Sequence, residues 1–379
     1  MKKIFCLLLC LVLVCTVLVS CGPDEIGDYI VNYPEKSEEI ENVTLNLYII
    51  AEEGTTANAK TTVQRMINQY TESEYHTTLN IHYLSSTEYN DAVVSAAADN
   101  GENGANIVLI NSASLYNNLR DDGRLLDLTK YFSSRTYGRL NTLITKALLD
   151  GSKETGKSES DKKLYVVPNN RIIDEYEYLV IDKHVARDIL HYSPAYLKSL
   201  TDPTSDAVEA LKQEITNAGY NADSLVFTTS GMYEVMAGLE SLGESGSYCN
   251  ITKYPTVDSD IAYASAFAII NRDKLGDGDI LDTTLSDRSM QIIYAINTDS
   301  YLRNLLQYGV SGTNYNVVDG DIVRVNDGEN NYRMNILYTG DVFKAEYCSE
   351  IGWTPEVAAY GLLQNAESVV KAPAQKESE

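Results

Sequence analysis

Cysteine, tryptophan and histidine are scarce in this chain of 379 residues, with six, one and four copies respectively. No G-x-S-x-G or H-E-x-x-H pattern occurs, and the histidines show no spacing typical of a zinc site. The common serine and zinc hydrolases therefore find no support in the sequence. The four histidines are His76, His82, His184 and His191.

Basic residues are also few. The chain has 30 Lys and Arg against 54 Asp and Glu, which gives a formal net charge of -24. A chain of this charge repels phosphate backbones and anionic lipid surfaces. The composition therefore excludes nucleic acid and an anionic membrane face as the main partners.

Phenylalanine is rare, with five copies, whereas tyrosine has 28. A tyrosine ring combines a flat apolar face with a polar tip, which suits the alternating faces and hydroxyls of a sugar or a peptide. The alternative is that most of these tyrosines pack at half-buried positions. We therefore expect ligand contacts only from tyrosines on loops at strand ends.

Long apolar runs are confined to the first twenty residues. Lys2 and Lys3 precede the apolar run Ile4 to Val19, and the small residue Ser20 follows it. This order is typical of a secretory signal. A membrane-spanning helix is the alternative, but about 16 apolar residues are fewer than the roughly 20 that span a bilayer. We predict a signal peptide over residues 1–20.

The tetrapeptide Leu18-Val19-Ser20-Cys21 resembles the lipobox of bacterial lipoproteins, in which the cysteine is acylated and becomes the mature N-terminus. Two or three acyl chains give stable anchoring. The acidic segment that follows lacks sustained periodicity, so residues 21–42 are predicted to form a tether. Cys21 is thus the predicted lipidation site, carrying palmitate or a similar chain.

Removal of the signal would leave Cys249 and Cys348 in the exported body. An oxidising compartment permits a disulfide between them, and two separate thiols are the alternative. The sequence leaves both alternatives open.

Strands and helices alternate along the first part of the body. Apolar alternation predicts strands, and apolar spacings of three and four predict helices. Such an alternation implies βαβ units and a parallel sheet. The predicted strands are Val43–Ile50, Thr78–Leu84 and Asn106–Asn111, and the predicted helices are Ala59–Glu72 and Tyr89–Ala98.

A second series begins near residue 163. The segment Thr204 to Gly219 carries helix start and stop signals, with Ser205 or Asp206 as N-cap. Ser289 to Gly309 is predicted to be helical in two pieces. The further predicted strands are Lys163–Pro168, Tyr176–Asp182 and Tyr263–Asn271.

Two segments imitate ligand-binding loops. Gly151 to Ser158 matches the phosphate-binding pattern G-x-x-x-x-G-K-S, but a helical pattern precedes it and a strand pattern follows, which is the wrong context. Arg272 to Asp282 resembles a calcium loop, but Leu275 and Thr284 fall where oxygen ligands are required. We interpret the first as a polar loop and the second as a turn, and we expect no metal or other cofactor.

Several segments, taken in order, resemble the extracellular solute-binding proteins of ABC importers, of the carbohydrate-associated family 1 type. The order and spacing of these segments carry the resemblance, which covers Val43 to about Val342. The segments are "YNNLRDDGRLLDLTKYF" (116–132), "KLYVVPNNRIIDEYEYLVIDKHV" (163–185), "YASAFAIIN" (263–271) and "LLQYGVSGTNYNVVDGDIV" (305–323).

The resemblance implies an α/β, two-lobed type 2 periplasmic-binding-protein fold with a cleft between lobes and three hinge crossings. Lobe 1 would comprise 43–168 plus 271–311, and lobe 2 would comprise 169–270 plus 312–379. The ligand would lie at the carboxyl ends of the strands. Carried onto this sequence, the ligand-binding residues are Glu52, Glu53, Asn111, Ser112, Asn170, Arg171, Tyr176, Ser230, Tyr233, Tyr263 and, more weakly, Trp353.

The function that follows is a lipid-anchored, extracellular, monomeric receptor that captures a sugar or oligosaccharide by hinge closure, delivers it to ABC permease subunits, and catalyses nothing. The membrane would be reached only through the lipid on Cys21. One alternative is an exported glycan hydrolase that uses paired carboxylates such as Glu52 and Glu53. Another is a surface scaffold lipoprotein without a small ligand.

Overall fold

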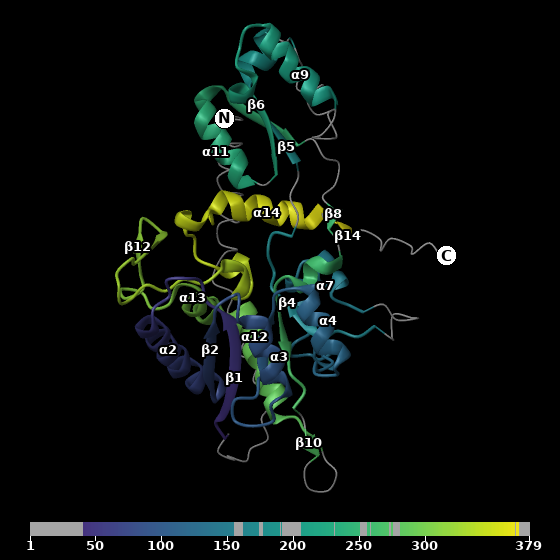
Figure 1. Cartoon of the computed structure of the whole chain (residues 1–379), viewed down its shortest axis with the longest axis vertical. Coiled ribbons are helices and arrows are strands. Elements are labelled where there is room, and N and C mark those ends of the chain that lie inside the picture. Colours follow the sequence, from purple (N-terminus) through teal and green to yellow (C-terminus); the bar gives the residue numbers. More distant parts are fainter. Residues whose placement is uncertain are drawn as a thin grey trace, which may run out of the picture. The chain divides into compact units, whose positions relative to one another are not determined.

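The computed structural model describes the body of the chain (Figure 1). The predicted signal peptide and almost all of the predicted tether lie outside the described residues, and so does Cys21. Within the described part, no helix combines the length and apolar character needed to span a bilayer. The described residues are 41–154, 162–173, 177–189, 191, 206–230, 232–250, 256–257, 259–272, 274–275, 281–367 and 369–370.

The larger sheet has five strands in the order β2-β1-β3-β9-β4. β1 pairs parallel with both β2 and β3, whereas β9 pairs antiparallel with both β3 and β4. The carboxyl ends of β1 to β4 therefore meet at one edge, beside the amino end of β9. The strands are β1 (Val43–Ile50), β2 (Thr77–Leu84), β3 (Ile107–Ile110), β4 (Val166–Pro168) and β9 (Ala266–Ile269).

The antiparallel β9 is a correction to the predicted parallel sheet. Its four residues are all buried, as the apolar run predicted. The apolar pattern specifies burial but not direction, so it could not reveal that the chain enters this strand from the opposite edge.

Helices cover the larger sheet. α2 (Ala57–Tyr75) buries Ala59, Val63, Ile67 and Thr71 at helical spacing, and Thr56 caps it by accepting a hydrogen bond from the Ala59 N–H. This amphipathic stripe faces the core. The other main helices of this part are α3 (Tyr89–Ala98), α4 (Ala113–Asp121), α12 (Thr284–Thr298) and α13 (Ser300–Tyr308).

The predicted break within Ser289–Gly309 is confirmed at Asp299. The Asp299 carboxylate accepts hydrogen bonds from the N–H groups of Tyr301 (2.8 Å) and Leu302 (3.4 Å), so it caps α13 where α12 ends. Gly309 ends α13 with a φ of +80°, a conformation that favours glycine.

A second sheet has three antiparallel strands in the order β6-β5-β7. The predicted strand Tyr176–Asp182 corresponds to β5 (Glu177–Asp182), and the predicted helix Thr204–Gly219 corresponds to α9 (Asp206–Asn217). The other two strands of this sheet are β6 (Val226–Ser230) and β7 (Gly246–Asn250), and the helix α11 (Met232–Leu242) lies between them in the chain.

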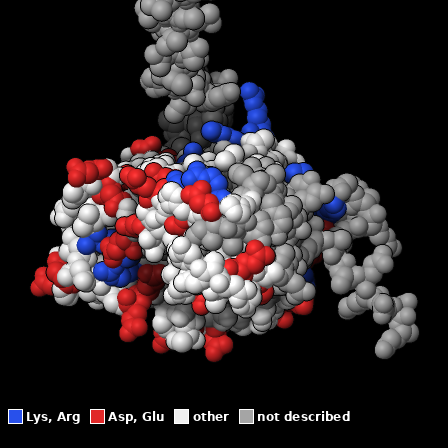
Figure 2. All heavy atoms as spheres, turned by 90° about the horizontal axis from the view of Figure 1, so that it is seen from above, with Lys and Arg blue, Asp and Glu red and all other residues white. Residues whose placement is uncertain are grey.

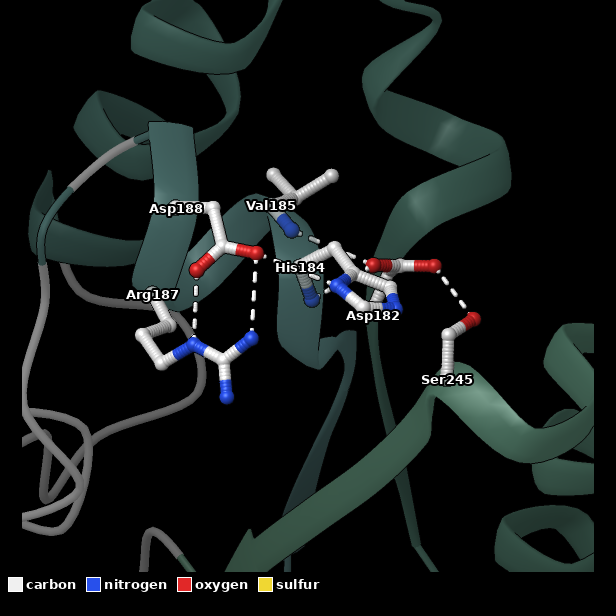
Figure 3. Close-up of polar contacts among 6 residues, drawn as sticks. All are labelled: Asp182, His184, Val185, Arg187, Asp188 and Ser245. Atoms are coloured by element: carbon white, nitrogen blue, oxygen red, sulfur yellow. Dashed lines mark hydrogen bonds and ion pairs between the residues drawn. The ribbon is translucent and has the colours of Figure 1, made fainter.

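Asp182 joins the end of β5 to its surroundings (Figure 3). Its carboxylate accepts hydrogen bonds from the His184 N–H (2.8 Å), the Val185 N–H (3.1 Å) and the Ser245 hydroxyl (2.5 Å). Burial opposes ionisation, but these hydrogen bonds outweigh it and lower the pKa of Asp182. The ionised carboxylate therefore fixes the turn that leaves β5.

Short elements complete the described chain. They are α5 (Thr129–Phe132), α6 (Leu140–Leu143), α7 (Lys146–Gly151), η2 (Val185–Ile189), α10 (Ala222–Leu225), η3 (Gly243–Ser245), β8 (Thr256–Val257), η4 (Ser259–Tyr263), β10 (Lys274–Leu275), β11 (Leu281–Asp282), β12 (Tyr315–Val318), β13 (Asp321–Arg324), η6 (Ile336–Tyr338), η7 (Val342–Lys344), η8 (Ser349–Ile351), α14 (Pro355–Glu367) and β14 (Val369–Val370).

The predicted lobe boundaries need two corrections. β9 was assigned to lobe 2 within 169–270, but it pairs between β3 and β4 in the larger sheet. Tyr332 and Met334 were assigned to lobe 2 within 312–379, but both lie in the core of the larger sheet. The chain thus returns to the larger sheet before residue 266, and part of the C-terminal region belongs with it.

The structure describes the flanks of the two imitation loops, while much of the predicted polar loop and of the predicted turn lies outside the described residues. Gly151 ends the helix α7, so a helix and not a strand precedes the G-x-x-x-x-G-K-S match; residues 155–161 lie outside the described residues. β10 and β11 pair as a hairpin across Arg272–Asp282. Across the described ranges, no group of three or more His, Cys, Asp or Glu is placed to hold a metal ion.

Carboxylates dominate the charged surface seen in Figure 2. Asp and Glu side chains are spread over the described atoms of that face, and Lys and Arg stand between them in smaller groups. The distribution agrees with the formal net charge of -24.

Candidate functional site

Predicted ligand-binding residues gather at the carboxyl edge of the larger sheet. Glu52 and Glu53 follow β1 and are exposed, and the half-buried Asn111 follows β3. Ser112 begins α4, where its hydroxyl accepts a hydrogen bond from the Leu115 N–H (3.3 Å) and donates one to the Asn111 side chain (3.2 Å). Strand direction alone brings these loops to one edge, next to the crossing that follows β4.

Asn170 lies in that crossing, between β4 and β5, and only 6% of it is exposed. Its side-chain oxygen accepts hydrogen bonds from the N–H (3.0 Å) and hydroxyl (2.7 Å) of Thr145, and its side-chain nitrogen donates to the Leu143 carbonyl (3.1 Å). Its own carbonyl accepts from the Val342 N–H (2.7 Å). The predicted ligand contact therefore has its amide occupied by the protein, and Asn170 positions the crossing.

Asn169 ties the same crossing to the start of β9. Its N–H donates to the Ser265 carbonyl (3.1 Å), and its side-chain nitrogen donates to the Ser265 hydroxyl (3.1 Å) and to the Leu337 carbonyl (3.0 Å). Ser265 also donates a short hydrogen bond to the Leu337 carbonyl. Three chain segments far apart in sequence thus meet at this point.

Arg171, the next residue of the crossing, is buried and charged, and no described residue acts as its counter-ion. Only 4% of the residue is exposed, and one guanidinium nitrogen donates to the Ile261 carbonyl (2.5 Å). Burial lowers the pKa of Arg171 to about 10, opposed by the nearby Tyr338 hydroxyl. No ion pair to a carboxylate is found for it within the described ranges, and a guanidinium has five N–H donors. Arg171 therefore has donors to offer a ligand.

α14, yellow in Figure 1, is bonded both to the crossing and to the second sheet. The Asn365 side chain donates to the Arg171 carbonyl (2.6 Å) and the Thr145 hydroxyl (3.1 Å), and it accepts from the Ile173 N–H (3.1 Å). Five residues earlier, the Tyr360 hydroxyl bonds the Tyr248 hydroxyl of β7 at 2.7 Å. The helix therefore holds the backbone on which Arg171 is mounted.

Asp341 is a buried carboxyl beside the crossing, with 4% exposed. It accepts a hydrogen bond from the Phe343 N–H (2.9 Å). Burial raises its pKa to about 6, although that hydrogen bond, the positive charges of Arg303 and Lys344, and the Asn170 side chain act in the opposite direction. The carboxyl therefore titrates in a range where ordinary aspartates are already ionised.

Tyr263 lies in η4, shortly before β9, and is half-buried. Its ring stacks on the buried ring of Tyr116, with centroids 3.9 Å apart and planes at 18°. The Tyr116 hydroxyl donates to Glu154 (3.0 Å), which also pairs with Arg120 (2.9 Å). One ring face of Tyr263 is thus covered by protein, and the residue stays a candidate through its remaining surface.

Trp353 is a core residue, with 5% exposed. It packs against Phe343 at a centroid distance of 5.7 Å and belongs to an apolar cluster with Val342, Val357 and Ala358. Its N–H donates a hydrogen bond to the Cys348 carbonyl, and its carbonyl accepts one from the Cys348 N–H. The ring is therefore not available for sugar stacking in this structure, contrary to the weaker prediction.

Cys348 is buried and carries a free thiol, which corresponds to the alternative of two separate thiols. Its predicted partner Cys249 lies in β7, and the Cys249 side chain is outside the described side chains. Burial raises the pKa of the Cys348 thiol, so it is less reactive than an ordinary one.

The structure does not describe the side chains of three further predicted ligand-binding residues, Tyr176, Ser230 and Tyr233. Tyr176 lies outside the described residues. Ser230 ends β6 and pairs with Glu177, the first residue of β5, so its backbone lies where the chain enters this sheet from the crossing. Tyr233 lies in the first turn of α11. The side chains of Ser230 and Tyr233 are outside the described side chains.

Sequence reasoning missed several residues of this site. Tyr338, Thr145 and Asn365 reach the crossing from segments that are distant along the chain. Asn365 looks like an ordinary helical position, and Thr145 like a loop residue. The one available signal was the doublet Asn169-Asn170 after Pro168, of which only the second residue was chosen.

Comparison with known proteins supports this architecture. No family model matches the sequence, and no curated protein does. The N-glycan transport solute binding protein (NgtS) from Streptococcus pneumoniae has a similar structure, with a TM-score of 0.55 and 16% identity over 87% of this chain and 84% of that chain. Its complex with Man5GlcNAc gives a TM-score of 0.52 and 16% identity, with the same coverage. The chain has the two-lobed α/β fold of extracellular solute-binding proteins.

Proposed function

We propose that this chain is the extracellular solute-binding component of an ABC importer and that it captures a sugar or oligosaccharide. The solute would bind between the lobes, hinge closure would enclose it, and the closed form would be recognised by the permease. A lipid on Cys21 would hold the protein at the cell membrane. The receptor would bind its solute without chemical change.

The observation that carries the proposal is the guanidinium of Arg171. A buried charge without a counter-ion costs free energy, and such groups are retained where a ligand completes their hydrogen bonds. A guanidinium donates two parallel hydrogen bonds to neighbouring oxygen atoms, which vicinal sugar hydroxyls supply. Arg171 follows β4 at the edge where this fold binds its solutes, and the half-buried ring of Tyr338 lies near it.

Aromatic and amide groups near Arg171 support a saccharide as the solute, and the exposed carboxylates of Glu52 and Glu53 lie at the same edge. The edge offers Asn111, Tyr263 and Tyr338 together with Arg171, and all three are half-buried. Tyrosine faces pack on the apolar face of a pyranose, while amides and guanidinium serve its hydroxyls. The similar protein NgtS was solved in complex with Man1GlcNAc and with Man5GlcNAc, which supports the choice of class.

A thermal-shift screen tests the proposed function. The soluble chain is heated with mono- and oligosaccharides, peptides and amino acids, and each mixture is then analysed for products. We expect at least one saccharide to raise the melting temperature without being converted, because ligands that bind only the folded state stabilise it by mass action. Cleavage of a glycan would favour the hydrolase, and silence across the whole panel would favour the scaffold.

Substitution Arg171→Gln tests the proposed contact. We expect the affinity for the saccharide found in the screen to fall about 10- to 100-fold, since a charged hydrogen bond contributes about 1.5 to 3 kcal/mol. Calorimetric titration measures the change. Arg288→Gln is the matched control, because Arg288 bonds the Tyr75 carbonyl next to the amino end of β2, at the opposite edge of the sheet. Equal affinities for the two variants would exclude Arg171 from the site.

A further inference from the structure

A groove lies along α13, and its lining runs from Ser300 and Tyr301 at the start of that helix to Gly309, Val310 and Ser311 beyond its end. Its volume is about 350 Å³, and apolar groups line most of it. Its lining includes Met66 of α2, Leu305 of α13 and Val310, together with Tyr301 and Tyr315. We call this the α13 groove. Cavities of this size accommodate one or two side chains of a partner or a small ligand.

The groove is separate from the proposed solute site. The cap of α13, Asp299, accepts a short hydrogen bond from the Tyr70 hydroxyl and a longer one from the Tyr75 hydroxyl (3.4 Å). Tyr75 ends α2 directly before the amino end of β2, whereas Glu52, Asn111 and Arg171 follow carboxyl ends. Of the described residues, none of the predicted ligand-binding residues at the carboxyl edge lines the α13 groove.

The charge of the α13 groove is negative. Among the described residues that line it, Glu346 alone carries a carboxylate and none is Lys or Arg. A helix N-terminus would by itself favour an anion, but the Asp299 carboxylate already occupies the N–H groups of Tyr301 and Leu302. Burial and the neighbouring Glu346 charge both raise the pKa of Tyr315, which places that carboxylate beside the phenol.

Two arginines of the β13 region are paired with another carboxylate. Arg324 and Arg333 both pair with Glu350, at 2.7 Å and 3.1 Å. The charge of Lys344 acts on Asp341. Glu346 forms no ion pair within the described ranges, so its charge is available to a cation from outside the chain.

Exposed apolar side chains belong to the lining of the α13 groove or follow its lining residues closely in sequence, and we call them its border. Tyr301 is 53% exposed, Val317 is 53% exposed and Tyr347 is 39% exposed. Val317 shares a strand face with Tyr315, and Tyr347 follows Glu346 directly. A free small amine would fill the cavity but leave this border uncovered, whereas a peptide segment would cover both.

We propose that the α13 groove docks a cationic amphipathic segment of a partner protein, with an apolar side chain between Tyr301 and Tyr315 and a lysine or arginine on Glu346. Apolar burial would supply the affinity, and the carboxylate would select the sign of the charge. This site is additional to the solute site and does not depend on which solute is bound.

Three synthetic nonapeptides test the proposal: one alternating leucine and lysine, one alternating leucine and glutamate, and one alternating serine and lysine. Each carries a fluorophore, and binding to the whole soluble chain is followed by anisotropy at 150 mM salt. We expect the leucine–lysine peptide to bind at least tenfold more tightly than the other two. Comparable binding of the serine–lysine peptide would reveal attraction by net charge alone and overturn the proposal, as would the absence of binding by the leucine–lysine peptide.

Matched variants locate the binding. Glu346→Gln and Tyr301→Ser are each expected to weaken the leucine–lysine peptide about tenfold. Glu240→Gln is the control, because it removes the same charge from an exposed position on α11. An equal loss in the Glu240 and Glu346 variants would contradict the assignment. Saccharide affinity should be unchanged in all three variants, so failure here is distinguishable from failure of the solute-binding function.

Discussion

Replacement of Gly340 by alanine is expected to lower the free energy of unfolding by about 3 to 5 kcal/mol, enough to unfold much of a marginally stable protein. Gly340 has a φ of +107°, where a side chain is strained. An added Cβ would lie 2.5 Å from both the carbonyl oxygen and a methyl carbon of Ile296. Ile296 belongs to the buried face of α12 and cannot move without disturbing the core. Urea denaturation measures the loss.

Gly123→Ala is the control for the Gly340 variant. Gly123 also has a positive φ, +67°, but an added Cβ there would meet nothing within 4 Å. We expect it to cost only the backbone strain, about 1 to 2 kcal/mol. Equal losses for the two variants would show that the close approach of residue 340 to α12 does not contribute. A larger loss of stability for the Gly340 variant would show that the close contact between Gly340 and Ile296 helps to fix the backbone next to Asp341.

We expect the Asp341→Asn variant to gain stability relative to the unchanged chain as the pH rises from about 4 to about 7. The difference between their free energies of unfolding should change by up to about 3 kcal/mol. The folded-state pKa of Asp341 is raised to about 6, whereas an unfolded aspartate titrates near 3.9. Below both values the carboxyl is protonated in both states, and burial is then least costly. As the pH rises, the unfolded state releases its proton first, which favours unfolding of the unchanged chain. Asparagine has no proton to release.

Denaturant unfolding at several pH values measures this difference. The asparagine side chain can still accept the hydrogen bond that the Phe343 N–H donates to residue 341. Asp91→Asn, at an exposed position of α3, is the control and should follow the unchanged chain across the same range. If the Asp341 and Asp91 variants show the same pH dependence, the buried carboxyl has no part in the linkage.

The apolar pattern predicted most of the larger sheet because burial of a strand is encoded locally. Val43–Ile50 and Tyr89–Ala98 have the predicted bounds, and Ser289–Gly309 is helical in two pieces as predicted, with the break at Asp299 located by the structure. The direction of β9 was not predictable in this way. Direction depends on which edge the chain enters from, and that is decided by segments outside the strand.

The candidate site was predictable as a set of loops but not as a set of free side chains. Asn170 and Arg171 are adjacent, and both were chosen as hydrogen-bonding ligands. Thr145, Leu143 and Val342 occupy the polar groups of Asn170, whereas Arg171 has a single bond to a described residue. No local pattern distinguishes the two, since the partners come from 25 or more residues away along the chain.

The burial of Trp353 was likewise not predictable from the local sequence. The resemblance made Trp353 a weaker candidate for ligand binding, but its neighbours Phe343 and Val357 bury it. Whether an aromatic ring is exposed depends on contacts between η7 and α14, which the sequence does not specify locally. The resemblance predicted the fold, and tertiary contacts decided which residues remain available.

A crystal structure of the chain with the saccharide that the screen identifies tests the proposed solute site most directly. We expect the saccharide at the carboxyl edge of the larger sheet, with its oxygen atoms within hydrogen-bonding distance of the Arg171 guanidinium and its glycosidic bonds intact. A saccharide bound elsewhere, with Arg171 paired to a carboxylate of its own chain, would contradict the proposed site.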